Sequence, residues 1–184
     1  MKLHEGRLIR EIKLLEPVVF EDNRGFFMES YNQQKYIGLG IGTVFIQDNH
    51  SLSKEAGVIR GLHYQLHPQA QSKLVRVTAG AIYDVVVDIR QGSPTYGKWE
   101  RFELSADNKR QLFVPAGFAH GFCTLVPNTE VQYKVDRLYS KEHDRGILWN
   151  DPAIGIQWPT THPILSEKDA EHPVLASAEH NFKY

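Results

Sequence analysis

The chain of 184 residues has a single cysteine and no long apolar run. With Cys123 alone, no disulfide can form within the chain, which is typical of proteins from a reducing compartment. No uninterrupted apolar stretch approaches the roughly 20 residues that cross a membrane, and Glu5 and Arg7 break the N-terminus before a signal peptide could form. We therefore expect a cytoplasmic protein without a membrane partner.

The chain also lacks a strong excess of either charge. Its formal net charge is -1, so nothing global indicates binding to nucleic acid or to an anionic membrane, although a local basic pocket is compatible with this balance. Hydrophobic residues make up 41% and charged residues 23%, as in ordinary globular proteins. No linker, repeat or low-complexity tract divides the chain, so we expect one domain over residues 1–184. Cys123 lies in an apolar run and is expected to be a packed small side chain.

Helical periodicity is scarce, and short runs of β-branched and aromatic residues alternate with turn signals. This pattern favours an all-β sandwich or barrel. Residues 78–81 are expected to form a hairpin turn, and the tail after Pro152 to pack across the barrel. Short helices are expected at 33–37 and after Ser166, which has the residue type of an N-cap. The expected strands cover 18–20, 26–30, 43–47, 58–65, 73–77, 82–89, 99–104, 111–114 and 129–135.

Two histidines stand at the edge of apolar, strand-like runs, His63 within 58–65 and His120 within 115–122. The second run begins with a Pro-Ala-Gly corner and resembles the second motif of the cupin superfamily. In metal-binding cupins the first motif supplies His-x-His and a nearby glutamate, but here His63 is followed by Tyr64 and Gln65. His67 lies four residues on, whereas strand residues share a face at intervals of two. Since zinc or iron needs three or four converging ligands, we expect no metal.

Proton transfer is the alternative chemistry for this pair of histidines. A histidine has an unperturbed pKa of about 6.5 and can act as a base near neutral pH. Lys73 and Arg60 offer positive charge for an oxyanion or a phosphate. Tyr133 alternates with Val131 and Val135, so its phenol is expected to enter the same interior and could return a proton from another direction.

Five blocks stand in collinear order along the chain: 20–29, 47–51, 60–65, 115–122 and 149–152. Together they resemble the dTDP-4-dehydrorhamnose 3,5-epimerase family over nearly the whole chain. The resemblance implies a mainly β, cupin-like double-stranded β-helix (jelly-roll) barrel with a few short helices. It implies an isomerase that inverts C3 and C5 of dTDP-4-dehydro-6-deoxy-D-glucose in dTDP-L-rhamnose biosynthesis, without a cofactor.

The resemblance also implies roles for individual residues. His63 is the base that removes the proton next to the C4 ketone, and Asp169 pairs with it. Lys73 stabilises the enolate oxygen, and Tyr133 donates a proton on the opposite face. Arginines suit the diphosphate, and Phe27 or Tyr139 could stack on the thymine; Asp144 stands where glutamate is common in the family. The expected substrate-binding residues are Arg24, Phe27, Glu29, Gln47, Asn49, Arg60, His120, Tyr139, Asp144 and Lys168.

Each of these residues has a structural alternative, such as a satisfied core histidine at 63 or a helix cap at Asp169. Two other functions stay open: a C5-only or C3-only epimerase or a ketoisomerase on a related dTDP-4-keto sugar, and a non-catalytic sugar-nucleotide-binding cupin. The resemblance implies a homodimer in which the Arg24–Glu29 segment contributes to the neighbouring site. The other histidines are expected to be structural or solvent-facing: His4, His50, His67, His143, His162, His172 and His180.

One spacing is at odds with a regular strand. Arg60 and His63 are three residues apart, so an unbroken strand would point their side chains to opposite faces. Both are expected to face the pocket. Gly61 could host a bulge that re-aims one of them, which predicts an irregularity near this residue.

Overall fold

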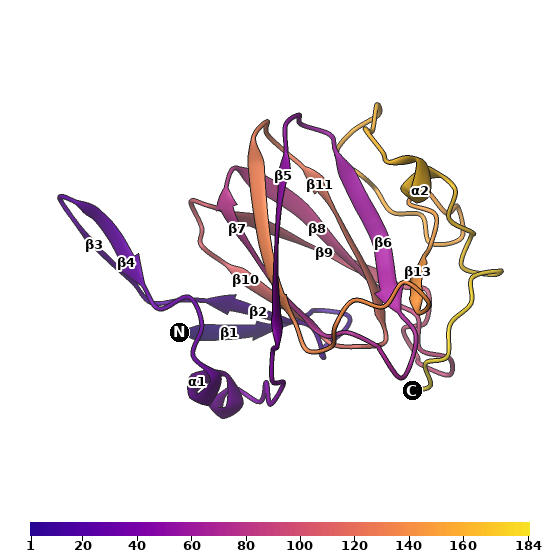
Figure 1. Cartoon of the computed structure of the whole chain (residues 1–184), viewed down its shortest axis with the longest axis horizontal. Coiled ribbons are helices and arrows are strands. Elements are labelled where there is room, and N and C mark those ends of the chain that lie inside the picture. Colours follow the sequence, from indigo (N-terminus) through magenta and orange to yellow (C-terminus); the bar gives the residue numbers. More distant parts are fainter.

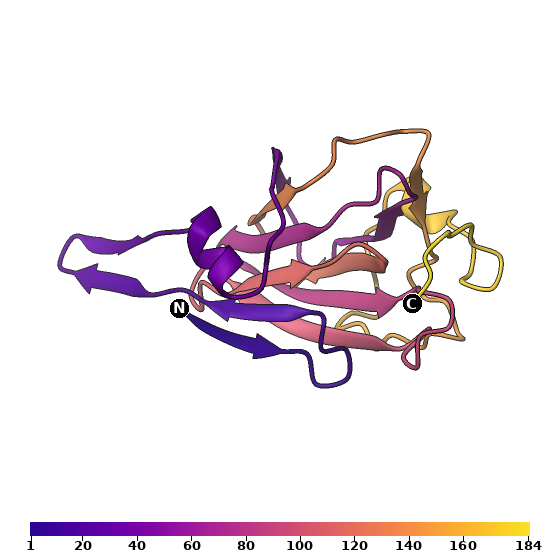
Figure 2. The same cartoon turned by 90° about the horizontal axis from the view of Figure 1, so that it is seen from below.

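The computed structural model describes residues 1–184 and confirms a mainly β fold. Two antiparallel sheets face one another, and a separate two-stranded hairpin extends from the body (Figure 1). The second view shows this hairpin at the far end from the C-terminal tail (Figure 2). Neither helix combines the length and the apolar character that a membrane crossing requires.

The larger sheet has six strands, and neighbours in the chain are often not neighbours in the sheet. Its order is β1-β2-β10-β7-β12-β5. Strands β7 and β12, which supply two of the expected catalytic residues, therefore lie side by side in its interior. The strands are β1 (Lys2–Glu5), β2 (Lys13–Glu16), β5 (Gln47–Ser53), β7 (Lys73–Ala79), β10 (Gln111–Val114) and β12 (Thr129–Val135).

The second sheet has five strands in the order β13-β6-β11-β8-β9. In its middle, β6 pairs with β11, which aligns His63 with His120. The two histidine-bearing runs of the sequence are thus adjacent strands. The strands are β6 (Ile59–Gln65), β8 (Ala81–Asp88), β9 (Trp99–Ser105), β11 (Phe118–Thr124) and β13 (Asp144–Gly146).

Both faces of the second sheet are covered, which explains why β8 reads as a continuous apolar run. Val86 packs into the cluster between the two sheets, whereas Val85 and Val87 point to the other face. There they meet Leu175 and Phe182 of the C-terminal tail. Full burial of each such side chain stabilises the fold by about 1.5–3 kcal/mol. The tail therefore packs against this sheet, as expected.

Two expectations about strand boundaries are wrong. Residues 78–81 do not form a hairpin turn, because Gly80 (φ +74°) carries the chain from β7 in one sheet to β8 in the other. A Cβ at Gly80 would lie 2.3 Å from Thr129 Oγ1, so the crossing also needs a small residue. Residues 43–46 are not a strand. Val44 and Ile46 are exposed there, and pairing begins only at Gln47.

Three strands were not predicted, whereas both short helices were. The strands β1, β2 and β13 are short and carry charged residues, so they lack an apolar run. Strand β11 was expected within the run 115–122, after the Pro-Gly corner. Asn32 caps α1 (Gln33–Gly38) and Ser166 caps α2 (Glu167–Ala170), each by accepting a backbone N–H three residues on. The hairpin consists of β3 (Val19–Asp22) and β4 (Gly25–Met28).

Candidate active site

A cavity of about 490 Å³ opens between the two sheets, and the expected catalytic residues line it together. His63 enters from β6, and Lys73 and Tyr133 enter from β7 and β12 of the facing sheet. Asp169 closes one side from α2. Arg60, His120 and Lys168 line the same cavity. The fold thus brings together seven of the predicted site residues from five separate elements.

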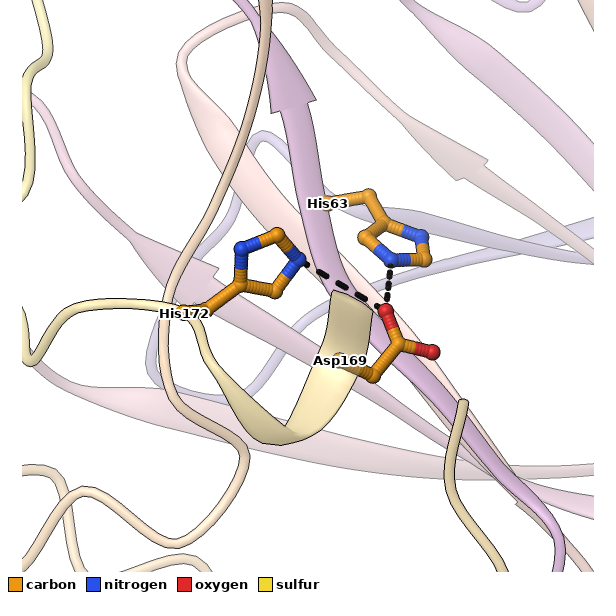
Figure 3. Close-up of side chains that lie close together, drawn as sticks. All are labelled: His63, Asp169 and His172. Atoms are coloured by element: carbon orange, nitrogen blue, oxygen red, sulfur yellow. Dashed lines mark hydrogen bonds and ion pairs between the residues drawn. The ribbon is translucent and has the colours of Figure 1, made fainter. Parts of the chain in front are cut away.

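The central contact of the cavity joins a histidine to a carboxylate 106 residues away in the chain. His63 Nε2 lies 2.5 Å from Asp169 Oδ1, and both side chains are drawn in Figure 3. Ser166 Oγ accepts a hydrogen bond from the Asp169 backbone N–H at 3.1 Å, which fixes the turn that carries the carboxylate. The His63 side chain keeps 33% of its surface exposed, whereas that of Asp169 keeps 6%. The ring is held from behind and open toward the cavity.

Two opposing effects act on the His63 ring. Burial disfavours the charged imidazolium and lowers the pKa of His63. The hydrogen bond and the charge of Asp169 act in the opposite direction, and the cations Lys73 and Lys168 add to the lowering. The ring therefore has a pKa below its ordinary value, so it is neutral and able to accept a proton near pH 7.

The predicted irregularity near Gly61 is confirmed. The pairing of β6 with β11 shifts register between the His63–His120 pair and the Arg60–Phe122 pair. Gly61 has φ +134°, a value that other residues rarely adopt. A Cβ at this position would lie 2.5 Å from Gly121 Cα, so only glycine allows this close approach of the strands. The shift lets Arg60 and His63 line one cavity despite their spacing.

Lys73 is a buried cation at the floor of the cavity. Its Nζ donates to the His63 backbone carbonyl at 3.5 Å, and the residue is 9% exposed. Burial lowers the pKa of Lys73 to about 8, against the charges of Asp84 and Asp144, which act to raise it. The ammonium is therefore mostly charged at neutral pH and only weakly solvated. Such a group interacts strongly with negative charge that develops beside it.

Tyr133 faces the cavity from the sheet opposite His63. It pairs in register with Asn49 on β5 and with Val75 on β7. Burial raises the pKa of its phenol, and the charge of Arg60 acts against that rise. The phenol is therefore protonated at neutral pH. Because His63 and Tyr133 project from different sheets, a ring-shaped ligand between them would meet one group on each side.

A second histidine–carboxylate pair lies deeper, between neighbouring strands of one sheet. His120 Nε2 lies 2.9 Å from Asp84 Oδ1 and 3.0 Å from Oδ2. Asp84 was not predicted as a site residue, although a lone acid inside the apolar run 82–87 was a usable signal. Burial raises the pKa of Asp84, while His120 and Lys73 act to lower it. Since Nε2 of His120 is engaged by Asp84, only the remaining edge of its ring is available to a ligand.

An adjoining cavity of about 240 Å³ holds the polar residues expected to bind substrate. It shares His63, Lys73, Tyr133 and Lys168 with the first cavity, so the two are continuous. Lys168 pairs with Asp144, whose Oδ2 also accepts a hydrogen bond from the Tyr139 hydroxyl at 3.1 Å. The further lining residues from the predicted set are Gln47 and Asn49, joined by a hydrogen bond of 2.9 Å.

Three predicted binding residues lie outside these cavities. Arg24 is on the β3–β4 hairpin, where its guanidinium pairs with Asp22 at 2.6 Å. Phe27, on the same hairpin, is 71% exposed. Glu29 follows β4 and pairs with Lys35 at 2.8 Å. A single chain therefore does not bring them to His63, and the hairpin points away from the body (Figure 1).

One further histidine, expected to be structural or solvent-facing, lies beside the His63–Asp169 pair. His172 Nε2 is 3.6 Å from Asp169 Oδ1, and its side chain is 10% exposed, so it does not face solvent. The three donor atoms of His63, Asp169 and His172 lie within 4.8 Å of one another, as metal ligands can. Two ligands on one tetrahedral zinc at about 2.0–2.1 Å would stand roughly 3.3 Å apart. The 2.5 Å contact of His63 has the length of a hydrogen bond instead.

Comparison with known proteins gives one consistent result. The family model described as dTDP-4-dehydrorhamnose 3,5-epimerase matches residues 7–177. A protein of that name from Shigella flexneri is 53% identical over 173 residues, which cover 94% of this chain and 95% of the relative.

Solved structures agree with the sequence comparison. The crystal structure of dTDP-4-dehydrorhamnose 3,5-epimerase from Bacillus anthracis with TDP and PPi bound has a TM-score of 0.91 at 58% identity, and covers 94% of this chain and 98% of that one. The structure of a dTDP-6-deoxy-D-glucose-3,5-epimerase from Legionella pneumophila, in complex with dTDP-4-keto-L-rhamnose, has a TM-score of 0.91 at 45% identity. It covers 96% of this chain and 93% of that one. These likenesses identify the two facing sheets as the expected cupin-like sandwich.

Proposed function

The chain belongs to the dTDP-4-dehydrorhamnose 3,5-epimerase family, and from this premise we propose that its cavity inverts both C3 and C5 of dTDP-4-dehydro-6-deoxy-D-glucose. The product is dTDP-4-dehydro-L-rhamnose, a precursor of dTDP-L-rhamnose. The observation that carries the proposal is the His63–Asp169 hydrogen bond, which faces Lys73 and Tyr133 across one cavity. These four groups form a base, its carboxylate partner, a cation and an acid on opposite sides of a ring-sized space.

His63 acts as the base in this proposal. A C–H bond next to a ketone is a weak acid, and its proton leaves only if the electron pair can move onto the ketone oxygen. The neutral His63 ring takes the proton, and the negative charge of Asp169 stabilises the imidazolium that forms. Lys73 stabilises the enolate oxygen. A single positioned donor to an oxyanion contributes roughly 3 kcal/mol in sites of this kind.

Tyr133 completes each inversion by giving its proton to the opposite face of the same carbon. After one inversion His63 carries an extra proton and Tyr133 lacks one. Both groups must therefore be reset by proton exchange before C3 and C5 have both been inverted. In heavy water this resetting supplies deuterium to Tyr133, so every inverted centre acquires a label from solvent.

Substrate binding is assigned to the cations and flat surfaces around the two cavities. Arg60, whose Nε donates to Ser53 Oγ at 3.2 Å, suits the diphosphate, as does Arg24. The thymine suits the aromatic faces of Phe27 or Tyr139. His120 and the lining set of the smaller cavity hold the sugar: Gln47, Asn49, Asp144 and Lys168. Glu29 joins this set from the end of the hairpin.

The site is proposed to be completed by a second copy of the chain. Arg24, Phe27 and Glu29 lie far from His63 in one chain, and the hairpin exposes Phe20 and Phe26 as well. A homodimer in which the Arg24–Glu29 segment reaches the neighbouring cavity accounts for both facts. A cytoplasmic location is proposed from the single, buried, unpaired Cys123.

Solvent exchange tests the reaction. Incubated in heavy water with dTDP-4-dehydro-6-deoxy-D-glucose, the protein should place deuterium at both C3 and C5 of the product, as detected by NMR. Label at one centre would make it a C3-only or C5-only epimerase. A product in which the keto group stands on a carbon other than C4 would indicate a ketoisomerase. Binding of dTDP without any label would leave only a sugar-nucleotide-binding role. Loss of turnover after exhaustive chelation would show that a metal is required.

Subunit mixing tests the shared site. Arg24→Ala and His63→Ala homodimers should each turn over slowly or not at all. A mixed dimer should recover activity, because one of its two cavities then combines an intact His63 with an intact Arg24 from the other copy. No recovery after verified subunit exchange would show that the hairpin serves its own chain.

A further inference from the structure

His172 occupies an unusual place beside the proposed base. It follows α2, three residues after Asp169, and its imidazole points at the same carboxylate oxygen that His63 contacts (Figure 3). Its Nε2 is buried and makes no hydrogen bond, and Asp169 Oδ1 lies 3.6 Å away. A buried polar nitrogen without a partner is costly unless it serves an electrostatic purpose.

The sheet leaves space for this ring at one glycine. Gly146 on β13 pairs in register with His63 on β6. A Cβ at Gly146 would lie 2.3 Å from His172 Nε2 and 2.4–2.5 Å from the two neighbouring ring carbons. Gly146 does not have a positive φ, so the backbone does not require glycine here. The residue is small because the His172 ring occupies the volume that a side chain would fill.

Asp169 is therefore flanked by two imidazoles. The ring centroids of His63 and His172 are 5.7 Å apart and the rings are inclined at 79°, so an edge of one ring meets the face of the other. Burial acts to raise the pKa of Asp169, but the contacts with His172 and His63 outweigh it and hold that pKa well below the usual range. The carboxylate stays ionised and interacts with both rings at once.

We infer that His172 is a positioning residue, which acts on the base His63 only through the Asp169 carboxylate that lies between them. With the proton on Nε2, the neutral ring directs the positive end of an N–H dipole at Oδ1. This dipole stabilises the anion and reduces the negative potential that His63 experiences. His172 does not line the cavity of about 490 Å³, so it does not touch substrate there.

The consequence is a base of lower pKa than a simple histidine–aspartate pair would give. The effect must be separated from those of the other charged and titratable groups near His63. Of these, Lys73 and Lys168 oppose protonation of the ring, as burial does. The groups that face the ring or its carboxylate come from four places: Arg60, His120 and Asp84 of the second sheet, Lys73 and Tyr133 of the facing sheet, Asp144 of β13, and Lys168, Asp169 and His172 at α2.

Two substitutions at position 172 separate electrostatics from shape. His172→Phe keeps a ring but removes the N–H group, whereas His172→Gln keeps an amide N–H near the position of Nε2. The pKa of His63 is measured in the free protein by NMR titration of its imidazole, assigned with a His63→Gln variant. We expect His172→Phe to raise that pKa by about half a unit or more. His172→Gln should restore at least half of the difference.

The kinetic readout should follow the titration. In His172→Phe the acid limb of the kcat profile should move to higher pH by a similar amount, with KM within about twofold of the native value, because the residue does not touch substrate. An unmoved His63 pKa in a folded His172→Phe protein would overturn the inference. An equal shift in His172→Phe and His172→Gln would overturn it too, since only the loss of the imidazole shape would then matter.

Gly146→Ala provides an independent variant that keeps both histidines. The added methyl group must displace the His172 ring, so the His63 pKa should rise as it does in His172→Phe. A folded Gly146→Ala protein with an unshifted pKa would count against the inference even if His172→Phe failed to fold. The kinetic part rests on the proposed function, but the titration does not. Absence of deuterium exchange in the native protein would remove the epimerase proposal, while an unshifted pKa would remove only the role of His172.

Discussion

The molecule contains two histidine–aspartate pairs that look alike in composition and differ in almost everything else. His63 and Asp169 meet at the edge of the cavity, where the His63 side chain is 33% exposed. His120 and Asp84 meet inside the second sheet, where the His120 side chain is 7% exposed. The pKa of Asp169 is held below its usual range, whereas burial raises that of Asp84. The same two residue types therefore give an ionised carboxylate in one place and a poorly solvated one in the other.

The difference lies in what surrounds each carboxylate. Asp169 has two imidazoles beside it, and the Ser166 hydroxyl also acts to lower its pKa, so the anion is compensated from several sides. Asp84 is completely buried among the strands, and its compensation comes from His120 and the charge of Lys73. The first pair keeps a ring open to a ligand. The second pair is buried, and the charge of its Asp84 acts to raise the pKa of Lys73. A histidine–aspartate contact alone does not identify a base, because both histidines line the cavity; the larger exposed fraction of the His63 ring distinguishes the two pairs.

Removal of His63 should produce the largest effect. His63→Ala removes the ring that takes the proton from the substrate, so deuterium exchange and turnover should fall by about 10³-fold or more. Binding of dTDP, followed by calorimetry, should be largely retained. His4→Ala, which changes an exposed histidine of β1, is the matched control and should behave like the native protein. Normal deuterium exchange in His63→Ala would indicate that His120, paired with Asp84, is the base instead.

Lys73 connects the two pairs, and its loss should rank second. Lys73→Met removes the cation beside the enolate oxygen and should lower kcat by about 10²–10³-fold. The native enzyme should also lose kcat/KM as pH rises through about 8, because Lys73 then loses its charge. Lys73→Arg, a cation that does not titrate in this range, should shift that alkaline limb to higher pH even if its rate is reduced. An alkaline limb that stays in place in Lys73→Arg belongs to another group.

Substitution of Tyr133 tests whether inversion needs an acid on the sheet opposite His63. Tyr133→Phe should slow inversion by about 10²-fold. His63 can still remove a proton and return a solvent-derived one to the same face. We therefore expect deuterium to appear in substrate whose configuration is unchanged, as measured by NMR of the recovered sugar nucleotide. Loss of exchange in parallel with loss of inversion would mean that Tyr133 is needed for proton removal itself.

The smallest effects concern stability, and the two pairs should respond to pH with opposite signs. The folded-state pKa of Asp169 is lowered, so its ionised form adds stability above the unfolded value of about 3.9, and this is lost as pH falls. Asp169→Asn should cost about 1–3 kcal/mol near pH 7 and progressively less below about pH 5. The folded-state pKa of Asp84 is raised, so the native protein loses stability as pH rises through that pKa. Asp84→Asn should thus become relatively more stable with rising pH.

Urea unfolding of the two asparagine variants and the native protein between pH 3.5 and 7 measures both trends. The difference in unfolding free energy between variant and native protein should slope in opposite directions for the two positions. Parallel slopes would show that the two carboxylates have the same ionisation behaviour, and the contrast drawn between Asp169 and Asp84 would then be wrong.

Much of the fold and of the cavity was predictable from the chain. The apolar strand runs, the cap at Ser166 and the irregularity of β6 at Gly61 all follow from local chemistry. His63, Lys73 and Tyr133 stood out as chemically active groups on strand-like segments. Asp84 and His172 were missed as members of the site. Neither residue stands out among its sequence neighbours, because the contact that gives it a role is made to a distant residue. His120, the partner of Asp84, lies 36 residues away, and Gly146, which leaves space for the His172 ring, lies 26 residues from His172.

The fold class, the strand content and the residue types available for proton transfer follow from the chain alone, because they depend on periodicity and side-chain chemistry that are local to each segment. The roles of those residues follow from the packing of distant segments. In the folded chain Gly80 lies where the chain crosses between sheets, His120 is a buried partner of Asp84, and His172 lies beside Asp169. Solvent exposure and the distance between charges set these roles, and both arise only when distant segments pack against one another.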